Sequence, residues 1–244
     1  MSKDLTKFLA GLEKLKISLN EEQIQQFLDY YEFLIETNKV MNLTAITEFD
    51  EVIEKHFLDS LSLTRVYDLR REVKILDMGT GAGFPGIPLK IAFPKIDLVL
   101  ADSLNKRIKF LQDVIEKLGF QKTSAIHARA EELGRNQDYR EQFDLCVSRA
   151  VANLASLSEY CIPFVKEGGM FISYKSGEIE EEVKQSKKAV SLLGGGMPKV
   201  YKFDLCEQKR SFVLIEKKKR TPKAYPRKAG TPTKLPLGQP MEKK

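Results

Sequence analysis

The spacing of hydrophobic residues changes its period near residue 73. Upstream of that point, apolar side chains recur every three or four positions, which predicts amphipathic helices. Downstream, short apolar runs alternate with helical stretches, a pattern typical of a parallel sheet that helices cover on both faces. The sequence therefore predicts a doubly wound α/β fold, with residues 1–70 as a helical N-terminal segment packed on the core and residues 71–216 as the main domain.

Apolar stripes predict three helices in the N-terminal segment. The second helix is expected to begin with a capping box made by Ser18 and Glu21, and the third to run from about residue 48 to residue 65. The sequence between these two helices, NKVMNLTAIT, has no clear period and is interpreted as a loop that returns to the body of the protein. The stripes consist of Leu5, Phe8, Leu9, Leu12 and Leu15, then Ile24, Phe27, Leu28, Tyr31, Leu34 and Ile35, then Ile53, Phe57 and Leu61.

Five short apolar runs in the main domain predict parallel strands. Helices are expected over residues 103–118 and about 178–192. Two further runs, VYKFDL and SFVLIEK, predict closing strands that pair in antiparallel fashion, which brings the sheet to about seven strands. The five parallel runs are VKILDMG, IDLVLAD, TSAIHA, FDLCVSRA and MFISYK.

Basic residues are concentrated at the C-terminus, within residues 217–244. This segment holds ten Lys or Arg residues and one acid, so it carries a charge of +9 and leaves −3 on the rest of the chain, against a total of +6. It also contains five of the ten prolines, which excludes a regular helix and predicts an extended, solvated basic arm. Such an arm either binds RNA phosphates or only keeps the protein in solution. In the first case, Tyr225 is expected to stack on a base and the forked guanidinium of Arg227 to donate hydrogen bonds to the RNA.

Few residues are available for a metal centre or a disulfide framework. Cys146, Cys161 and Cys206 are scattered and His56 and His127 are the only histidines, so no metal site is expected and each cysteine is interpreted as a free, buried thiol. No run approaches the ~20 apolar residues that cross a bilayer, and the N-terminus is amphipathic. The chain is therefore expected to be a cytoplasmic protein, and a monomer.

Small or polar residues mark the point at which each of the five parallel runs ends. Because the carboxyl ends of parallel strands meet at one edge of a sheet, these positions are expected to form a single site. They are Gly79 to Gly83, then Asp102, then Arg129 to Glu131, then Ser148 and Arg149, and finally Lys175.

The glycine turn after the first strand can be read in two registers. Gly81, Gly83 and Gly86 spell G-x-G-x-x-G, the dinucleotide fingerprint, whereas Asp77, Gly79, Gly81 and Gly83 spell D-x-G-x-G-x-G, a pattern associated with S-adenosylmethionine. Both cofactors contain an adenosine ribose, and Asp102, 23 residues after Gly79, is placed to accept its hydroxyls. The turn and this carboxylate together predict an adenosine-containing cofactor.

Three details favour the methyl donor over the dinucleotide. Asp77 would repel a pyrophosphate but can orient the cationic amino-acid end of S-adenosylmethionine. Pro85 and Pro88 remove N–H groups that a pyrophosphate would bind at the start of the following helix. Glu131 places a further anion near the site, which a cationic sulfonium tolerates.

Several motifs occur in order along nearly the whole chain: NLTAIT, KHFLDSL, LDMGTGAGFPGIPL, HARAEEL, FDLCVSRAVANL and YPRKAGTPTKLPL. Together they resemble the bacterial RsmG family, also called glucose-inhibited division protein B. The resemblance implies a Rossmann-like class I methyltransferase sheet in residues 71–216. It also implies transfer of a methyl group from S-adenosylmethionine to N7 of a guanine in 16S ribosomal RNA, guanine 527 of the 530 loop, free or within a 30S subunit or its assembly intermediate.

The resemblance also implies which residues hold the cofactor. Carried over by motif, the contacts are Gly79 and Phe84 in the glycine turn, Ala130 and Glu131 after the third strand, and Arg149, which binds either the cofactor or the RNA. Asp77, Gly81, Gly83 and Asp102 complete the set of expected cofactor-binding residues.

The end of the fourth strand, VSRAVANL, lacks the motifs of amine-directed and C5-directed methyltransferases. Guanine N7 has a free lone pair, so its methylation needs placement rather than a general base. No catalytic residue is therefore expected, and Arg129, Arg149, Lys175 and Arg210 are the candidates for positioning the RNA. His56 and Asp59 lie three residues apart on one helix face, where they can bond each other. This pair is expected either to dock the helical segment on the sheet or to contact RNA.

Two other functions are compatible with the same residues. One is a methyltransferase that acts on a small molecule, which the basic C-terminus disfavours. The other is a regulator that senses NAD through the glycine turn and binds nucleic acid without catalysis.

Overall fold

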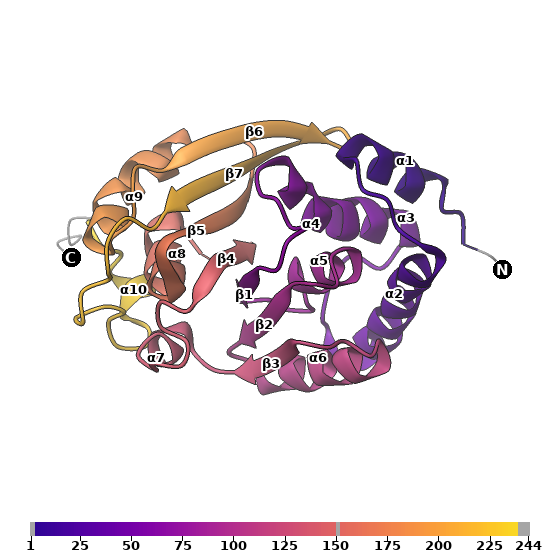
Figure 1. The fold of residues 1–244 in the computed structure, drawn as a ribbon, viewed down its shortest axis with the longest axis horizontal. Helices are drawn as coiled ribbons and strands as arrows, with labels where there is room; N and C mark the ends of the chain where they lie inside the picture. Colours follow the sequence, from indigo (N-terminus) through magenta and orange to yellow (C-terminus); the bar gives the residue numbers. More distant parts are fainter. Residues whose placement is uncertain (1–2, 150–151, 239–244) are drawn as a thin grey trace.

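The computed structural model describes residues 3–149 and 152–238, with a seven-stranded sheet at its centre (Figure 1). The strand order is β3-β2-β1-β4-β5-β7-β6. The first five strands in this order run parallel, and β7 is antiparallel to both of its neighbours, β5 and β6. The order reverses between β1 and β4, which is where ligands bind in sheets of this kind. The predicted doubly wound α/β fold is confirmed. The strands are β1 (Lys74–Met78), β2 (Asp97–Asp102), β3 (Thr123–His127), β4 (Phe143–Arg149), β5 (Val165–Ser176), β6 (Lys199–Leu205) and β7 (Gln208–Glu216).

Helices cover both faces of the sheet, and each face has its own apolar core. Alternation along β1 supplies both cores, because Ile75 belongs to the core under the N-terminal helices and Leu76 to the core on the opposite face. Figure 1 shows α2, α5 and α6 on one side and α8 and α9 on the other. The helices of the main domain are α5 (Gly86–Ala92), α6 (Asn105–Lys117), α7 (Ala130–Leu133), α8 (Leu154–Cys161), the 3₁₀ turn η3 (Ile162–Phe164) and α9 (Glu180–Leu192).

The N-terminal helices are fixed to the main domain by side chains of α2 (Glu21–Met41). The Gln23 amide donates to the carbonyl of Ile91 at 2.7 Å, and the Tyr30 hydroxyl donates to the carbonyl of Ala82 at 2.5 Å. Both side chains therefore seat α2 against the glycine turn and the helix that follows it.

Two details of this segment differ from the sequence prediction. The cap of α2 is made by Asn20 and Gln23, each side chain bonding the other's backbone N–H, because Ser18 lies two residues outside the helix. The third predicted helix is a continuous helical stretch, but a π-helical turn interrupts its α geometry. Its parts follow α1 (Thr6–Leu15) and α2, and are α3 (Phe49–Val52), the π-helix η1 (Ile53–Leu58), α4 (Asp59–Leu61) and the 3₁₀ turn η2 (Ser62–Arg65).

The C-terminal segment is folded onto the domain, contrary to the prediction of an extended, solvated arm. We call residues 217–238 the strap. Its backbone carbonyls, which no regular element satisfies, accept hydrogen bonds from side chains of the domain, including those of Arg135 and Arg140. The strap contains one helical turn, α10 (Thr231–Lys234), and the part of the prediction that covers residues 239–244 lies outside the described residues.

Two ion pairs anchor the strap. The Lys217 ammonium is 1% exposed and donates to the Ile162 carbonyl at 2.8 Å, with Glu141 at 3.3 Å. The Arg227 guanidinium binds the fully buried carboxylate of Glu159 at 2.6 Å. The proline-rich sequence excludes a regular helix, as predicted, but buried charge partners on the domain still order it.

Within the described residues, no helix has both the length and the apolar composition needed to cross a membrane.

Candidate functional site

The predicted strand ends meet at one edge of the sheet, where two cavities adjoin. The first cavity has a volume of about 380 Å³ and is lined by the glycine turn, Phe84, Asp102 and Arg149. The second cavity has a volume of about 410 Å³ and is lined by Asp59, Arg149, Lys175 and Arg210 together with aromatic rings. His56 and Arg149 line both cavities, so these two side chains form their common border.

The glycine turn gives the first cavity its floor. Gly81 has φ +62° and no atom within 4 Å of the position where a Cβ would stand, so its bare backbone faces open space. Gly83 has φ +104°, and a Cβ there would lie 2.5 Å from Ile87 and 2.9 Å from the Tyr30 hydroxyl. The first glycine thus leaves room for a ligand, and the second allows the turn to pack against α2 and α5.

Asp77, at the end of β1, is hydrogen-bonded to the glycine turn and to the start of α5. Its buried carboxylate accepts hydrogen bonds through Oδ2 from the Thr80 hydroxyl at 2.7 Å and the Gly86 N–H at 2.8 Å. Oδ1 is also buried and has no hydrogen-bond partner among the described residues. Burial raises the pKa of Asp77 to about 6, although both hydrogen bonds oppose that shift. Asp77 is not among the residues that line the first cavity.

Asp102 ends β2 in the wall of the first cavity. Its Oδ2 accepts from the Gly81 N–H at 3.0 Å and from Arg107 at 3.2 Å, and its Oδ1 accepts from the Leu104 N–H at 2.9 Å. These donors keep the carboxylate in one orientation, with its oxygens beside the glycine turn.

Phe84, in the first cavity, contacts both of the side chains at the border between the two cavities. The rings of His56 and Phe84 lie 4.4 Å apart at 24°, and the Arg149 guanidinium lies 5.1 Å from the Phe84 ring centre. His56 Nδ1 lies 3.2 Å from Arg149 Nη2, which can only donate, and 3.1 Å from the Lys55 carbonyl oxygen, which can only accept. Nδ1 therefore accepts from Arg149 in one tautomer and donates to Lys55 in the other, while Nε2 lies 3.0 Å from the Thr44 hydroxyl. Burial, together with the charge of Arg149, lowers the pKa of His56 to about 4.

Asp59 joins two arginines at the second cavity. Its Oδ2 accepts from Arg149 Nη1 at 2.9 Å and its Oδ1 accepts from Arg210 Nε at 2.8 Å. The expected bond between His56 and Asp59 is not observed; both residues bond Arg149 instead. Arg149, at the end of β4, lies within hydrogen-bond distance of both side chains and bridges them, which docks this helical stretch on the sheet.

Lys175 lies in the wall of the second cavity, where its ammonium bonds the Glu182 carboxylate at 2.7 Å. Arg129 is exposed and lines neither cavity. Ala130 and Glu131 begin α7, also outside the lining of the first cavity, and Glu131 Oε1 accepts from the Gly230 N–H of the strap at 2.8 Å. The strand ends β1, β2, β4 and β5 therefore meet directly, while the end of β3 lies beside them.

The sequence did not single out several residues that line the cavities. Thr44 belongs to the NLTAIT motif, and Arg107 follows Asp102 by five residues, so both carried a weak signal. Phe203 and Phe212 carried none, because an aromatic residue in a strand is more often part of a core. No cluster of three His, Cys, Asp or Glu residues that would hold a metal occurs in the described part of the chain.

Comparisons with known proteins agree over most of the chain. The family model described as "rRNA small subunit methyltransferase G" (GidB) matches residues 23–213. A protein of Lachnoclostridium phytofermentans named "Ribosomal RNA small subunit methyltransferase G" is 53% identical over 237 residues, which cover 96% of this chain and 98% of its own. A protein of the same name from Bacillus licheniformis is 45% identical, covering 96% of this chain and 99% of its own.

Solved structures share the fold at low sequence identity. A SAM-dependent O-methyltransferase from Thermotoga maritima has a TM-score of 0.52 and 15% identity, covering 78% of this chain and 73% of its own. A SAM-dependent methyltransferase from Aquifex aeolicus has a TM-score of 0.51 and 14% identity, covering 71% and 96% respectively. These likenesses identify the sheet as that of class I methyltransferases.

Proposed function

This chain belongs to the rRNA small subunit methyltransferase G family, and we propose that it methylates N7 of a guanine in 16S ribosomal RNA. It is an S-adenosylmethionine-dependent rRNA methyltransferase, in agreement with its relatives and its fold. The choice of guanine 527 in the 530 loop rests on the motif resemblance, as does the choice of free RNA, subunit or assembly intermediate as substrate. Neither the small-molecule methyltransferase nor the NAD-sensing regulator is favoured by these relatives.

The observation that carries the proposal is the first cavity, whose features suit an adenosine-bearing cation. Gly79 and Gly81 offer backbone without side-chain obstruction, and Asp102 offers fixed oxygens to the ribose hydroxyls. Phe84 supplies an apolar ring, and Arg149 places a positive charge at the border of this cavity. Gly83 is proposed to contribute by allowing the turn to pack against its neighbours rather than by contacting the cofactor.

Asp77 is proposed to act on the cationic end of the cofactor from beneath the turn. A buried oxygen without a partner is costly, and Asp77 Oδ1 is such an atom. An ammonium group, or a water that the ammonium orders, would satisfy it. We therefore propose that the Asp77 carboxylate orients the amino-acid end of S-adenosylmethionine, and the unpaired Oδ1 supports this proposal.

Ala130 and Glu131 are proposed to meet the adenine through their backbone. The Glu131 carboxylate already accepts the N–H of Gly230, so its charge is directed to the strap. The free N–H groups at the first turn of α7 remain to bond the adenine edge. The strap would then help to hold this turn in place.

The reaction requires no general base. S-adenosylmethionine bound in the first cavity would supply a methyl group on a sulfonium sulfur. The N7 lone pair would accept this methyl group as the C–S electron pair returns to sulfur, with no proton lost. The chain's contribution is placement, which is consistent with a His56 that is neutral and engaged at both ring nitrogens. Arg149, Lys175 and Arg210 are proposed to position the RNA at the second cavity, and Arg129 to contact it from the neighbouring surface.

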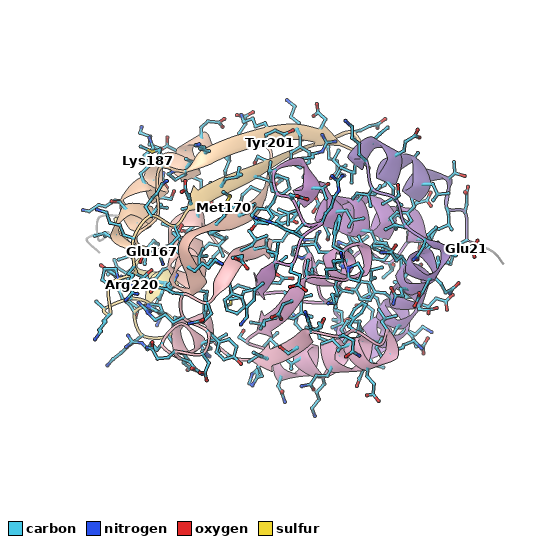
Figure 2. The ribbon with its side chains drawn as sticks, viewed as in Figure 1. Glu21, Glu167, Met170, Lys187, Tyr201 and Arg220 are labelled. Carbon is cyan, nitrogen blue, oxygen red and sulfur yellow. The ribbon has the colours of Figure 1, made fainter. Side chains whose placement is uncertain are left out.

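The strap is proposed to hold RNA phosphates in its folded form. Arg220, labelled in Figure 2, is one of its exposed cations. Lys217 and Arg227 serve inside the fold, but the other basic residues of the strap point to solvent. The exposed set is Lys218, Lys219, Arg220, Lys223, Lys228 and Lys234.

Calorimetric titration tests the cofactor assignment. S-adenosylmethionine is expected to bind with one site per chain and NADH is expected not to bind. Binding of NADH alone would overturn the proposed reaction.

A further inference from the structure

We infer that the second cavity receives the target base and that Arg149 selects guanine by donating a hydrogen bond to its O6. This inference rests on the proposed function and names the residue that sets the specificity of that site. It begins from the position of Arg149, whose guanidinium lines both cavities. Any atom that passes from one cavity to the other does so beside this group.

The second cavity has the lining that a purine requires. Tyr174, Phe203 and Phe212 form an apolar wall, in which the rings of Phe203 and Phe212 stack at 5.0 Å and those of Tyr174 and Phe212 meet edge to face at 4.8 Å. Ile46, from the loop before α3, lines the same space. A cavity of about 410 Å³ with an aromatic wall and a few convergent polar groups is typical of a site for a flat ligand.

Arg149 keeps donors available after its structural bonds are made. Nη1 donates to the Lys55 carbonyl at 3.1 Å and to Asp59 at 2.9 Å, and one Nη2 hydrogen points to His56 Nδ1 at 3.2 Å. A guanidinium has five N–H donors. The Nε hydrogen and the second Nη2 hydrogen have no protein partner within residues 3–149 and 152–238.

Contacts with Asp59 and Phe84 fix the position of the Arg149 guanidinium before any ligand binds. Asp59, itself held by Arg210, and the Phe84 ring, whose centre is 5.1 Å from the guanidinium carbon, hold the guanidinium at the border of the two cavities. Its side chain is 16% exposed, so a hydrogen bond to a ligand there is formed largely out of water.

Guanine and adenine differ beside N7 in a way that a donor can read. Guanine presents O6, an acceptor, next to N7, whereas adenine presents the N6 amino group, a donor. If N7 is to meet the methyl group, its lone pair has to stay free, and O6 is the adjacent atom that Arg149 can hold. An adenine in the same pose would place two donors against each other.

The test replaces the base and the arginine in turn. The substrate is 16S rRNA, free or reconstituted into small subunits, ligated around a synthetic segment with guanine or 2-aminopurine at the target position. 2-Aminopurine keeps N7 but lacks O6. At saturating S-adenosylmethionine, the wild-type chain is expected to methylate guanine about 10- to 100-fold more efficiently, as fits loss of a hydrogen bond to a charged group.

The variant Arg149→Gln is expected to reduce this ratio to within about threefold, even if its overall rate is low. Arg107→Gln is the matched control, because Arg107 lines the first cavity only. This variant is expected to keep the wild-type preference for guanine over 2-aminopurine, whether or not calorimetry shows a change in its affinity for S-adenosylmethionine. Phe203→Ala is expected to raise KM for RNA with an unchanged Kd for S-adenosylmethionine.

The outcomes separate this inference from the proposed function. Absence of methylation on guanine substrate by the wild-type chain would contradict the proposed function itself. Methylation of guanine with equal use of 2-aminopurine, or a ratio that Arg149→Gln leaves unchanged, would overturn only the reading of O6 by Arg149. An unchanged KM for RNA in Phe203→Ala would overturn the assignment of the base to the second cavity.

Discussion

Arg149, at the end of β4, donates a hydrogen bond of 2.9 Å to Asp59 in the N-terminal helical segment. The same carboxylate accepts from Arg210 at 2.8 Å, so one acid of α4 joins the N-terminal helices to β4 at the centre of the sheet and to β7 in its antiparallel part. All three side chains are at most 18% exposed. The site and the attachment of the N-terminal segment therefore depend on one cluster of charges.

Substitution Asp59→Asn is expected to lower the free energy of unfolding by about 3–5 kcal/mol, because it leaves two guanidinium groups that are at most 18% exposed without their counter-charge. Denaturant unfolding at pH 7 measures this. Asp50→Asn is the control, since its ion pair with Lys7 is more than half exposed, and a change of at most about 1 kcal/mol is expected there. Equal effects of the two substitutions would contradict a structural role for the cluster.

His56 is expected to make stability depend on pH. Its pKa is about 4 in the folded chain and about 6.5 when unfolded, so between these values the unfolded chain binds more protons. The contribution of the neutral imidazole is therefore complete above pH 6.5 and is lost as the pH falls toward 4. The difference in unfolding free energy between wild type and His56→Gln should rise by about 2–3 kcal/mol from pH 4 to pH 7. A difference that does not vary with pH would show that His56 titrates normally.

Asp77 is expected to show the opposite slope. Its folded pKa of about 6 lies above the ordinary value, so the stability that its protonated form contributes is lost as the pH rises through 6. Asp77→Asn keeps an acceptor for Thr80 and Gly86 and removes the buried charge. Relative to wild type, the variant should gain about 2–3 kcal/mol of stability between pH 4 and pH 8.

The same substitution should weaken S-adenosylmethionine binding about tenfold or more, because an amide donor replaces the unpaired acceptor Oδ1. Calorimetry at pH 7.5 measures this loss. The variant is therefore predicted to be more stable than wild type and to bind S-adenosylmethionine more weakly. Unchanged S-adenosylmethionine binding would show that Asp77 is not part of the cofactor site.

The exposed cations of the strap are expected to add to RNA affinity through salt-dependent contacts. Replacing four of them by Gln should reduce the slope of log affinity against log salt by up to about 0.7 per phosphate contact on single-stranded RNA. The strap variant carries changes at Lys218, Lys219, Arg220 and Lys223, and a control variant with the same change of charge carries them at Lys14, Lys16, Arg70 and Lys95. Equal slopes in the two variants would leave the strap without a role in RNA binding.

Much of the site could be predicted because it follows from topology. Once β1, β2, β4 and β5 are recognised as parallel strands, the residues that end them have to meet, and Gly81, Asp102 and Arg149 do. The short-range patterns that identify β1, β2 and β4 are strong because these central strands are buried on both faces.

Other features depended on contacts that no local pattern encodes. The strap is ordered by Glu159 and Arg140, residues more than 65 positions away in the sequence, so composition alone predicted a solvated arm. The cap at Asn20 was missed because Ser18 and Glu21 match the same motif two residues earlier. The predicted bond between His56 and Asp59 was wrong because both side chains bond Arg149, which lies at least 90 positions away in the sequence.

The central claim is that this chain methylates N7 of one guanine in 16S ribosomal RNA with S-adenosylmethionine as the donor. Mass mapping of modified nucleosides in 16S rRNA, from cells that have or lack this protein, tests it most directly. The expected result is the loss of a single 7-methylguanosine, in the 530 loop, and its return when purified protein and S-adenosylmethionine are added to the unmodified subunits or RNA. An rRNA modification pattern that is identical in both kinds of cell would contradict the claim.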